Sequence, residues 1–488
     1  MWYGYTGEQT SYKRLTIAMS DNTFLFHDYE TFGVHPGRDR PCQFAAIRTD
    51  WDLNPIGKPI ELFCQPPNDY VPHPQACLVT GITPQLAMKK GLIESDFIER
   101  INSEFSQPGT CGVGYNSIRF DDEVTRYTLY RNFLDPYERE WKNGNSRWDL
   151  IDMVRACYAL RPEGIEWPTN DDGLVSFRLE LLTAANGLSH ANAHDAVSDV
   201  YATITMAKLI KDKQPKLFNY LLNLRNKKSV AQQFDLLNNK PLVHISGMFG
   251  AAQGCASWVL PIAWHPINKN AMIVVDLNKD ASVLLSLSAE EIHQRLYTAR
   301  SELAADELPI PVKLIHTNKC PVLAPASTLT PERAEELGLN RAQCRQSLDL
   351  LAKNKAEVEQ KLSQVFAIER EFDQDSNPDT ALYNGFIGNA DKNLMQVLRS
   401  SDPNLISKQQ FQFADPRLNQ LILRYKARNY PECLNESELQ QWQAHRQASI
   451  TEQVALVFPE LEMLMSEYQN DTNKINILKS LYNYIENL

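Results

Sequence analysis

Apolar residues near the start of the chain come in short runs that predict strands rather than long helices. Three apolar residues at 24–26 lead directly towards Asp28, and the stretches CQFAAIRTD and PIELFCQP predict two further strands on either side of a turn at 53–57. Thr83 and Pro84 have the pattern of an N-cap followed by the first residue of a short helix. The remaining predicted elements are a strand over 110–115, a helix over 121–132 and a long helix over 195–213. Strands followed by helices indicate an α/β domain.

The apolar pattern changes along the 488 residues, which divides the chain into an extension and three predicted domains. Residues 1–20 are an extension that we expect to be disordered, and residues 21–212 form the α/β domain. Residues 213–355 contain short β-rich runs such as KPLVHISGMFG and ASWVLPIAW, which predict a small barrel or open sheet. In residues 356–488 glycine nearly vanishes, and segments such as ILKSLYNYIENL predict a helical domain.

Composition narrows the class of protein. With 49 basic and 60 acidic residues the formal charge is −11, which lowers the expectation of a nucleic-acid partner. Arginines or metal ions in a cleft can still attract phosphate to a protein whose net charge is negative. No stretch reaches the roughly 18 apolar residues of a membrane span, and the N-terminus lacks the features of a secretion signal. Nine cysteines, an odd number without a C-x-x-C pair, indicate reduced thiols and predict a cytoplasmic protein.

The first predicted strand ends in two carboxylates. In FLFHDYETFG, Asp28 and Glu30 point to the same side of the strand because side chains alternate faces. Two like charges at such a short distance repel one another, and each raises the pKa of the other unless a cation lies between them. The pair therefore suggests a metal site, although a solvated strand end would also explain it.

Two later segments supply further polar groups. Asp121 follows a predicted strand in GYNSIRFDDE and opens a helix, where N-capping explains it equally well. In NAHDAVSDVYA, His194 and Asp199 lie about 500° apart on a regular helix, so His194 is expected on the loop or first turn before the helix body. A lone histidine is more often structural, and Asp195 suits a cap, but Asp199 interrupts an apolar helix face that should pack on a sheet.

The order of these groups resembles the DEDD exonuclease superfamily, in its histidine-bearing branch. Asp28, Glu30, Asp121 and Asp199 match the four acids of that pattern, and His194 matches its histidine. Surrounding segments, among them HDYETFG, GYNSIRFDDEVTR, NSRWDL, SFRLELL and the later KLIHTNKCPVLA and ALYNGF, resemble the bacterial exodeoxyribonuclease I family over essentially everything after the first twenty residues.

This resemblance implies an α/β ribonuclease H-like exonuclease domain, a small SH3-like β-barrel domain and an all-helical C-terminal domain. It also implies a monomer that hydrolyses single-stranded DNA from the 3′ end to 5′-mononucleotides in DNA repair or recombination, with single-stranded DNA-binding protein as a partner through its acidic tail. Oxygen ligands without thiolates favour two Mg²⁺ ions, with Mn²⁺ as a substitute. The four acids would hold the ions, and His194 would take the proton from the attacking water.

The residues after Asp121 interleave arginines with aromatic side chains, which suits a single strand because arginine follows the backbone and aromatic rings stack on any base. The alternative is that about half of these aromatics belong to the core. The resemblance favours Glu30 and these further residues as substrate contacts: Arg126, Tyr137, Trp141, Arg155 and Arg178, with Lys240 and Trp258 as weaker candidates.

Two alternatives remain at this point. Within the superfamily, the chain could be an exoribonuclease or a proofreading exonuclease, although such relatives usually need the catalytic domain alone. From another class, it could be a single-strand-binding scaffold with a silent nuclease domain, but such a protein gains nothing from clustered, mutually repelling carboxylates.

Overall fold

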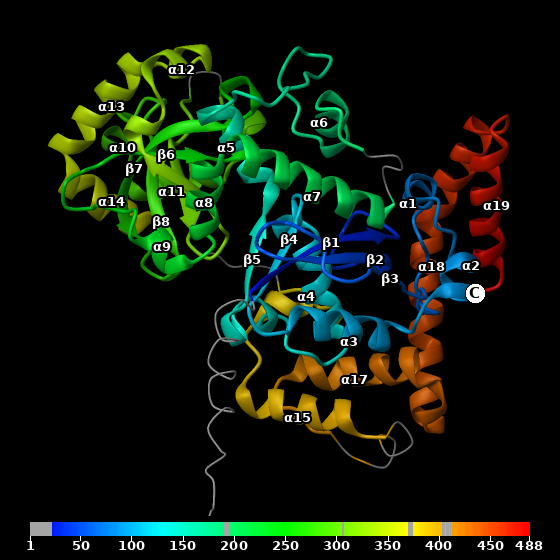
Figure 1. Cartoon of the computed structure of the whole chain (residues 1–488). Helices are drawn as coiled ribbons and strands as arrows, with labels where there is room; N and C mark the ends of the chain where they lie inside the picture. The colour runs from blue at the N-terminus through cyan, green and yellow to red at the C-terminus, as the bar shows by residue number, and fades with distance from the viewer. Residues whose placement is uncertain are drawn as a thin grey trace, which may run out of the picture.

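The computed structural model describes residues 22–189, 195–304, 307–368, 374–402, 406, 409 and 411–488. Two predictions concern residues outside these ranges: the disorder of the extension at residues 1–20 and the catalytic role of His194. Three parts follow one another along the chain, as the colours of Figure 1 show. In the part of the chain that the structure describes, no helix is long and apolar enough to cross a membrane.

The first part is built on a five-stranded mixed sheet with the order β3-β2-β1-β4-β5. Its strands are β1 (Thr23–Thr31), β2 (Pro41–Thr49), β3 (Ile60–Phe63), β4 (Thr110–Gly114) and β5 (Ser146–Asp149). The central strand β1 pairs antiparallel with β2 and parallel with β4, and β4 pairs parallel with β5. The predicted strands are therefore all present, and their order places the end of β1 in the middle of the sheet.

Helices cover both faces of this sheet (Figure 1). The helices of the first part are α1 (Pro74–Thr80), α2 (Pro84–Lys90), α3 (Glu94–Phe105), α4 (Asp121–Arg131), α5 (Leu150–Leu160), α6 (Leu179–Ala185) and α7 (Ala196–Lys213). Side-chain alternation along β1 decides what each helix meets. Phe24 and Phe26 share a core with residues of α5 and α7, whereas Leu25 and Tyr29 pack with residues of α3 and α4. Asp28 and Glu30 have the parity of Phe24, so they lie on the α7 side.

The second part is an antiparallel sheet with the order β10-β6-β7-β8-β9. Its strands are β6 (Leu242–Ile245), β7 (Ala256–Trp264), β8 (Ala271–Asp276), β9 (Val312–His316) and β10 (Val322–Pro325). Helices α8 (Pro215–Asn223) and α9 (Lys227–Ala231) precede it, and α10 (Val283–Ser286), α11 (Ala289–Tyr297), α12 (Pro331–Glu336), α13 (Arg341–Lys353) and α14 (Lys355–Ala367) accompany it. Val358 and Leu362 of α14 pack with Ile273 of this sheet, so packing places α14 with the second part, although we predicted the helical domain to begin at residue 356.

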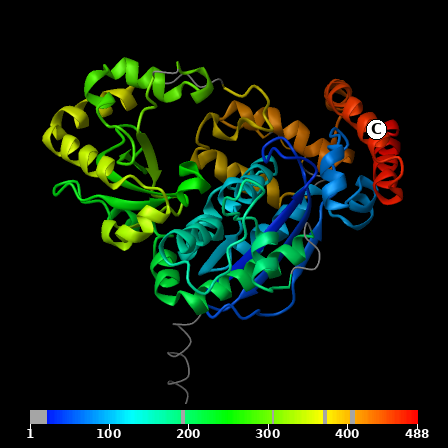
Figure 2. The ribbon, with the colours of Figure 1, turned by 90° about the horizontal axis from the view of Figure 1, so that it is seen from above.

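The third part is helical. Its helices are α15 (Asn389–Ser400), α17 (Pro416–Asn429), the 32-residue α18 (Glu436–Glu467) and α19 (Thr472–Glu486). Two apolar clusters join it to the first part: Phe32 and Tyr70 pack with Leu461 and Leu478, and Phe133 packs with Tyr425. The middle and C-terminal parts thus both rest on the first part and lie on different sides of it (Figure 2).

Candidate active site

Three carboxylates meet where β1 ends beside the start of α7. Asp28 and Glu30 lie near the C-terminal end of β1, and Asp199 lies in the first turn of α7. One oxygen atom from each of the three lies within 4.8 Å of the other two. Asp195 is the N-cap of α7 and accepts a hydrogen bond from the backbone N–H of Ser198, which confirms its predicted capping role. The D-x-E pair therefore faces a third acid from a segment about 170 residues later.

Asp121 joins this group from the first turn of α4. Its Oδ1 atom accepts a hydrogen bond of 3.0 Å from the backbone N–H of Tyr29, the residue between Asp28 and Glu30. The N-cap of α4 is Phe120 and not Asp121, so the capping explanation of Asp121 is wrong. His194 lies outside the described residues, and its position relative to the four acids stays a prediction.

Burial and mutual repulsion make the carboxyl groups of Asp28, Glu30 and Asp121 hard to ionise. Burial, followed by the charges of Asp199 and Asp121, raises the pKa of Glu30 to about 8. Burial is also the main cause that raises the pKa of Asp121 to about 8, and the pKa of Asp28 lies well above its ordinary value because of burial and the neighbouring acids. A cluster of this kind stores electrostatic repulsion that a divalent cation would relieve. Its donors are all carboxylate oxygens, the ligand type that Mg²⁺ and Mn²⁺ prefer.

The neighbouring acid Asp122 has the opposite environment. Its two oxygens bind Arg139 and Arg147, each at 2.8 Å, and the guanidinium charges hold the pKa of Asp122 well below its usual value despite its burial. A satisfied ion pair of this kind is structural. Asp121 and Asp122 are adjacent in the sequence, yet Asp121 faces the acid cluster and Asp122 binds two arginines.

Most of the arginine-aromatic segment after Asp121 is interior. Arg126 binds Glu140 with hydrogen bonds of 2.7 and 2.9 Å and Glu123 at 2.7 Å, and its guanidinium lies 5.3 Å from the centre of the Tyr137 ring. Tyr130 and Trp148 are buried in the core, whereas Trp141 is 62% exposed. The expectation that about half of these aromatics are core is confirmed, and Trp141 is the aromatic of this segment that presents most of its surface to solvent.

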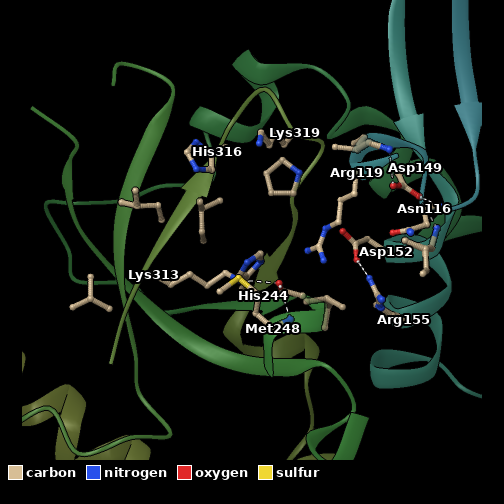
Figure 3. A pocket seen from close by; sticks show the side chains of 18 of the residues that line it. Asn116, Arg119, Asp149, Asp152, Arg155, His244, Met248, Lys313, His316 and Lys319 are labelled. Carbon is tan, nitrogen blue, oxygen red and sulfur yellow. Dashed lines mark hydrogen bonds and ion pairs between the residues drawn. The ribbon is translucent and has the colours of Figure 1, made fainter. Parts of the chain in front are cut away.

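A cavity of about 590 Å³ lies between the first part and the middle sheet (Figure 3). Arg155 of α5, one of the predicted substrate contacts, lines it together with Arg119 from the loop after β4. The opposite wall contributes Lys313 and His316 of β9 and, just beyond that strand, Lys319. The cavity is therefore a cleft with basic groups on both walls, which the formal charge of −11 does not reveal.

The other predicted contacts are more scattered. The Arg178 side chain is 76% exposed at the start of α6, and Lys240 is a surface residue that pairs with Asp235 at 3.1 Å. Trp258 is half-buried and packs both on the core that the first part shares with the middle sheet and on the second core of the middle part. It donates its indole N–H to the carbonyl of Ala326 at 3.0 Å. These contacts explain Trp258 by packing.

Family comparisons cover the three parts in their order along the chain. The model described as Exonuclease matches residues 25–207, that of the exonuclease I SH3-like domain matches 225–368, and that of the exonuclease I C-terminal domain matches 376–488. The chain belongs to the exodeoxyribonuclease I family. The ribonuclease H-like, SH3-like and helical fold predicted from the sequence is thereby confirmed, and the chain is a nuclease with a domain that works with divalent metal ions.

Individual members of the exodeoxyribonuclease I family align over nearly the whole chain. Exodeoxyribonuclease I of Escherichia coli (strain K12) is 52% identical over 468 residues, 96% of this chain and 98% of the relative. A crystal structure of E. coli exonuclease I in complex with a dA16 oligonucleotide has a TM-score of 0.93 at 52% identity and covers 96% of this chain and 99% of that chain. A crystal structure of SSB/exonuclease I in complex with the inhibitor CFAM has a TM-score of 0.89 at 51% identity, with coverages of 96% and 99%.

Sequence reasoning missed the basic residues of the cleft. Arg119 stands two residues before Asp121 in GYNSIRFDDE, and Lys313 and Lys319 lie in KLIHTNKCPVLA. Both segments carry the resemblance to the exodeoxyribonuclease I family, so the signal was present as sequence similarity. Nothing in their spacing showed that residues almost 200 positions apart line one cleft.

Proposed function

We propose that this chain is a single-strand-specific exodeoxyribonuclease that removes nucleotides from the 3′ end and releases 5′-mononucleotides in DNA repair or recombination. The observation that carries the proposal is the meeting of Asp28, Glu30 and Asp199 oxygens within 4.8 Å of one another, in a chain of the exodeoxyribonuclease I family. The complex of the E. coli relative with a dA16 oligonucleotide supports DNA as the substrate.

In this proposal Asp28, Glu30, Asp121 and Asp199 hold two Mg²⁺ ions, with Mn²⁺ as a substitute. Such ions stabilise the charges on the attacking and leaving oxygens of an in-line phosphoryl displacement. The backbone N–H of Tyr29 holds the Asp121 carboxylate beside β1, so that this acid enters the site already oriented. His194 would accept the proton of the attacking water, a role that suits histidine because its imidazole exchanges a proton readily near neutral pH.

The strand path is the next step of the proposal. We assign the phosphates to the basic cleft, where Arg119, Arg155 and Lys313 offer cations from both walls. Trp141, 62% exposed, would stack on a base, because aromatic stacking tolerates every sequence. Arg178 is exposed enough to approach the scissile phosphate.

Arg126, Tyr137, Lys240 and Trp258 stay proposed contacts of lower rank, because each is already engaged with protein groups. A strand that bound Arg126 or Lys240 would first have to break an existing ion pair.

A second cavity suits a partner with an acidic tail. This cavity of about 500 Å³ is lined by apolar side chains such as Leu217 and Pro325 and by the cations Arg161 and Lys216. We propose that it receives the tail of single-stranded DNA-binding protein, in keeping with the solved SSB/exonuclease I structure. We further propose a monomer in the cytoplasm, a location that agrees with the buried thiols of cysteines such as Cys42 and Cys157.

The test is degradation of single-stranded DNA carrying a 5′ label, in Mg²⁺ and in chelator, by the native chain, Asp28→Ala and the matched surface variant Asp172→Ala. We expect a ladder that shortens from the 3′ end in Mg²⁺ with the native chain and with Asp172→Ala. Asp28→Ala and the chelator should abolish it, and a blunt duplex should resist. Faster loss of an RNA strand would favour an exoribonuclease. A mobility shift of the DNA that survives chelation, without any shortening of the strand, would favour the alternative of a single-strand-binding scaffold with a silent nuclease domain.

A further inference from the structure

Three acidic residues lie among the cations that line the basic cleft: Glu123, which is paired with Arg126 at 2.7 Å, and the aspartates Asp149 and Asp152. Asp152 of α5 accepts a hydrogen bond of 2.7 Å from Arg155, one turn later on the same helix, and its side chain is 28% exposed. Figure 3 shows Asp152 entering the cavity on the wall that also carries Arg119 and Arg155. A negative charge in a path for a polyanion opposes binding, so its presence calls for an explanation.

Asp149, the other aspartate of that wall, has a structural role that Asp152 does not share. Asp149 caps α5, and its oxygens accept hydrogen bonds from the backbone N–H groups of Asn116, Ile118 and Ile151 at 2.8 to 3.1 Å. Burial, and then the charge of Asp152, raises the pKa of Asp149 to about 7. Asp152 directs its carboxylate to a cation of the cleft instead.

The field of Asp152 also reaches the opposite wall. Burial lowers the pKa of Lys313 on β9 to about 8, and the Asp152 carboxylate is the largest influence that opposes this fall. Lys313 donates a hydrogen bond of 2.7 Å to the hydroxyl of Ser246. One carboxylate therefore acts on two of the cations to which we assign the strand.

Arg155 is held by other groups besides Asp152. Its guanidinium lies 5.9 Å from the centre of the Phe177 ring, and a Cβ atom on Gly247 would come within 3.1 Å of its Cζ atom. The guanidinium is thus confined between the Phe177 ring and the short 3-10 helix Gly247–Phe249 after β6. Asp152 neutralises Arg155 more than it positions it.

We propose that Asp152 is a built-in competitor of the DNA phosphates, a point that rests on the proposed function. In the free protein its carboxylate occupies Arg155, and an arriving phosphate takes the carboxylate's place. When the strand advances by one nucleotide, a phosphate leaves before the next arrives, and Asp152 neutralises the cation in between. The exchange lowers the affinity of the cleft for a resting strand and also lowers the barrier to its movement.

The experiment measures binding of a fluorescent oligo(dT) in chelator at several salt concentrations. For Asp152→Asn we expect roughly tenfold tighter binding at low salt, the effect of removing one nearby repulsive charge. We also expect the slope of log K against log salt to steepen by about 0.7, the value for one more net neutralised phosphate on a single strand. In Mg²⁺ and with excess substrate, the variant should release nucleotides more slowly per enzyme molecule, because the strand moves less easily.

The matched control is Glu336→Gln, which removes the carboxylate of an equivalent ion pair, Arg333–Glu336 at 2.7 Å, on α12. This variant should bind and degrade DNA like the native chain. Equal thermal midpoints of native, Asp152→Asn and Asp152→Ser proteins would show that each variant is folded.

The outcomes separate two failures. Weaker or unchanged binding by Asp152→Asn, while Lys313→Ala weakens the native affinity, overturns the role of Asp152 and leaves the cleft as the DNA path. A native chain that binds no single strand, or a Lys313→Ala variant with native affinity, overturns the proposed path itself. A merely orienting Asp152 predicts weaker binding and a shallower salt slope, the opposite sign of both effects.

Discussion

Replacing Glu30 by glutamine should stabilise the metal-free protein while it removes the response to metal. Glu30 is 9% exposed, and burial and the neighbouring acids raise the pKa of its carboxyl group from 4.5 to about 8. Glutamine keeps the size of the side chain and removes the charge that this site resists. The same substitution takes one oxygen ligand from the cluster with Asp28 and Asp199.

The magnitude follows from the linkage between protonation and folding. At pH 7 the unfolded glutamate is ionised, about 2.5 pH units above its pKa, whereas the folded group retains its proton. At about 1.4 kcal/mol per unit, folding with Glu30 costs about 3 kcal/mol more than folding with an uncharged side chain. Between pH 4.5 and about 8 the folded state binds more protons than the unfolded state, so the free energy of unfolding falls as pH rises through this window. The free energy of unfolding of Glu30→Gln should lack this contribution to its decrease with pH.

The assay is the thermal midpoint of metal-free protein between pH 4.5 and 8.5, with and without Mg²⁺. About 3 kcal/mol corresponds to roughly 6–12 °C for a domain of this size, which is an upper limit because the other acids remain. Mg²⁺ at about 100 times its dissociation constant should stabilise the native chain by about 2.7 kcal/mol and the variant by much less. Glu163→Gln, a substitution of an exposed glutamate in the same domain, should change neither property.

Two results would refute this reasoning. Equal pH slopes of native and Glu30→Gln proteins would show that Glu30 is not held protonated by burial and by the other acids. A variant that is less stable at pH 8 without metal would show that the Glu30 carboxylate makes favourable contacts that outweigh the repulsion.

Three further predictions concern the cleft and the domain contacts. Trp141→Ala should weaken binding of single-stranded DNA by about 1–3 kcal/mol in a titration, without a change in thermal midpoint, because one exposed stacking surface is lost; an unchanged affinity would remove Trp141 from the strand path. The affinity of the native chain for DNA should fall above pH 8, because the charge of Lys313 is present below its pKa of about 8 and is lost as pH rises through it. Lys313→Met should lack this fall, and a variant whose affinity falls in parallel with that of the native chain would contradict the reasoning. Arg428→Met should destabilise the protein by about 3–5 kcal/mol and speed limited proteolysis of the C-terminal part, because it removes the guanidinium that the buried carboxylates of Asp69 and Asp379 share, each 2.6 Å from Arg428. An unchanged rate of cleavage would show that this contact does not hold the domains together.

The local pattern of the chain was sufficient for the elements around the site. Alternation along β1 placed Asp28 and Glu30 on one side, and the helical spacing after Asp195 placed Asp199 in a helix that begins at Ala196. These predictions succeeded because side-chain direction in a strand or helix follows from the backbone geometry of a few consecutive residues. The order of the acids then carried the resemblance to the family.

The tertiary structure decided which charges are free to act. Asp121 and Asp122 are adjacent and chemically alike, yet one faces the acid cluster and the other binds two buried arginines. The interleaved arginines and aromatics after them suggested a DNA grip, but Arg126 is committed to carboxylates and Tyr130 is in the core. A local pattern cannot distinguish these cases because the partners are distant in sequence.

The strands and helices that carry the acids could thus be predicted without any structure. The same holds for the division into α/β, β-rich and helical regions and for the chemical type of the site. The fold alone decided that Lys313 faces Arg155 and Arg119 across one cleft, where Asp152 also lies. The physical reason is that a pKa and an ion pair depend on burial and on charges within a few ångströms. Those neighbours come together only when the middle sheet packs against the first domain.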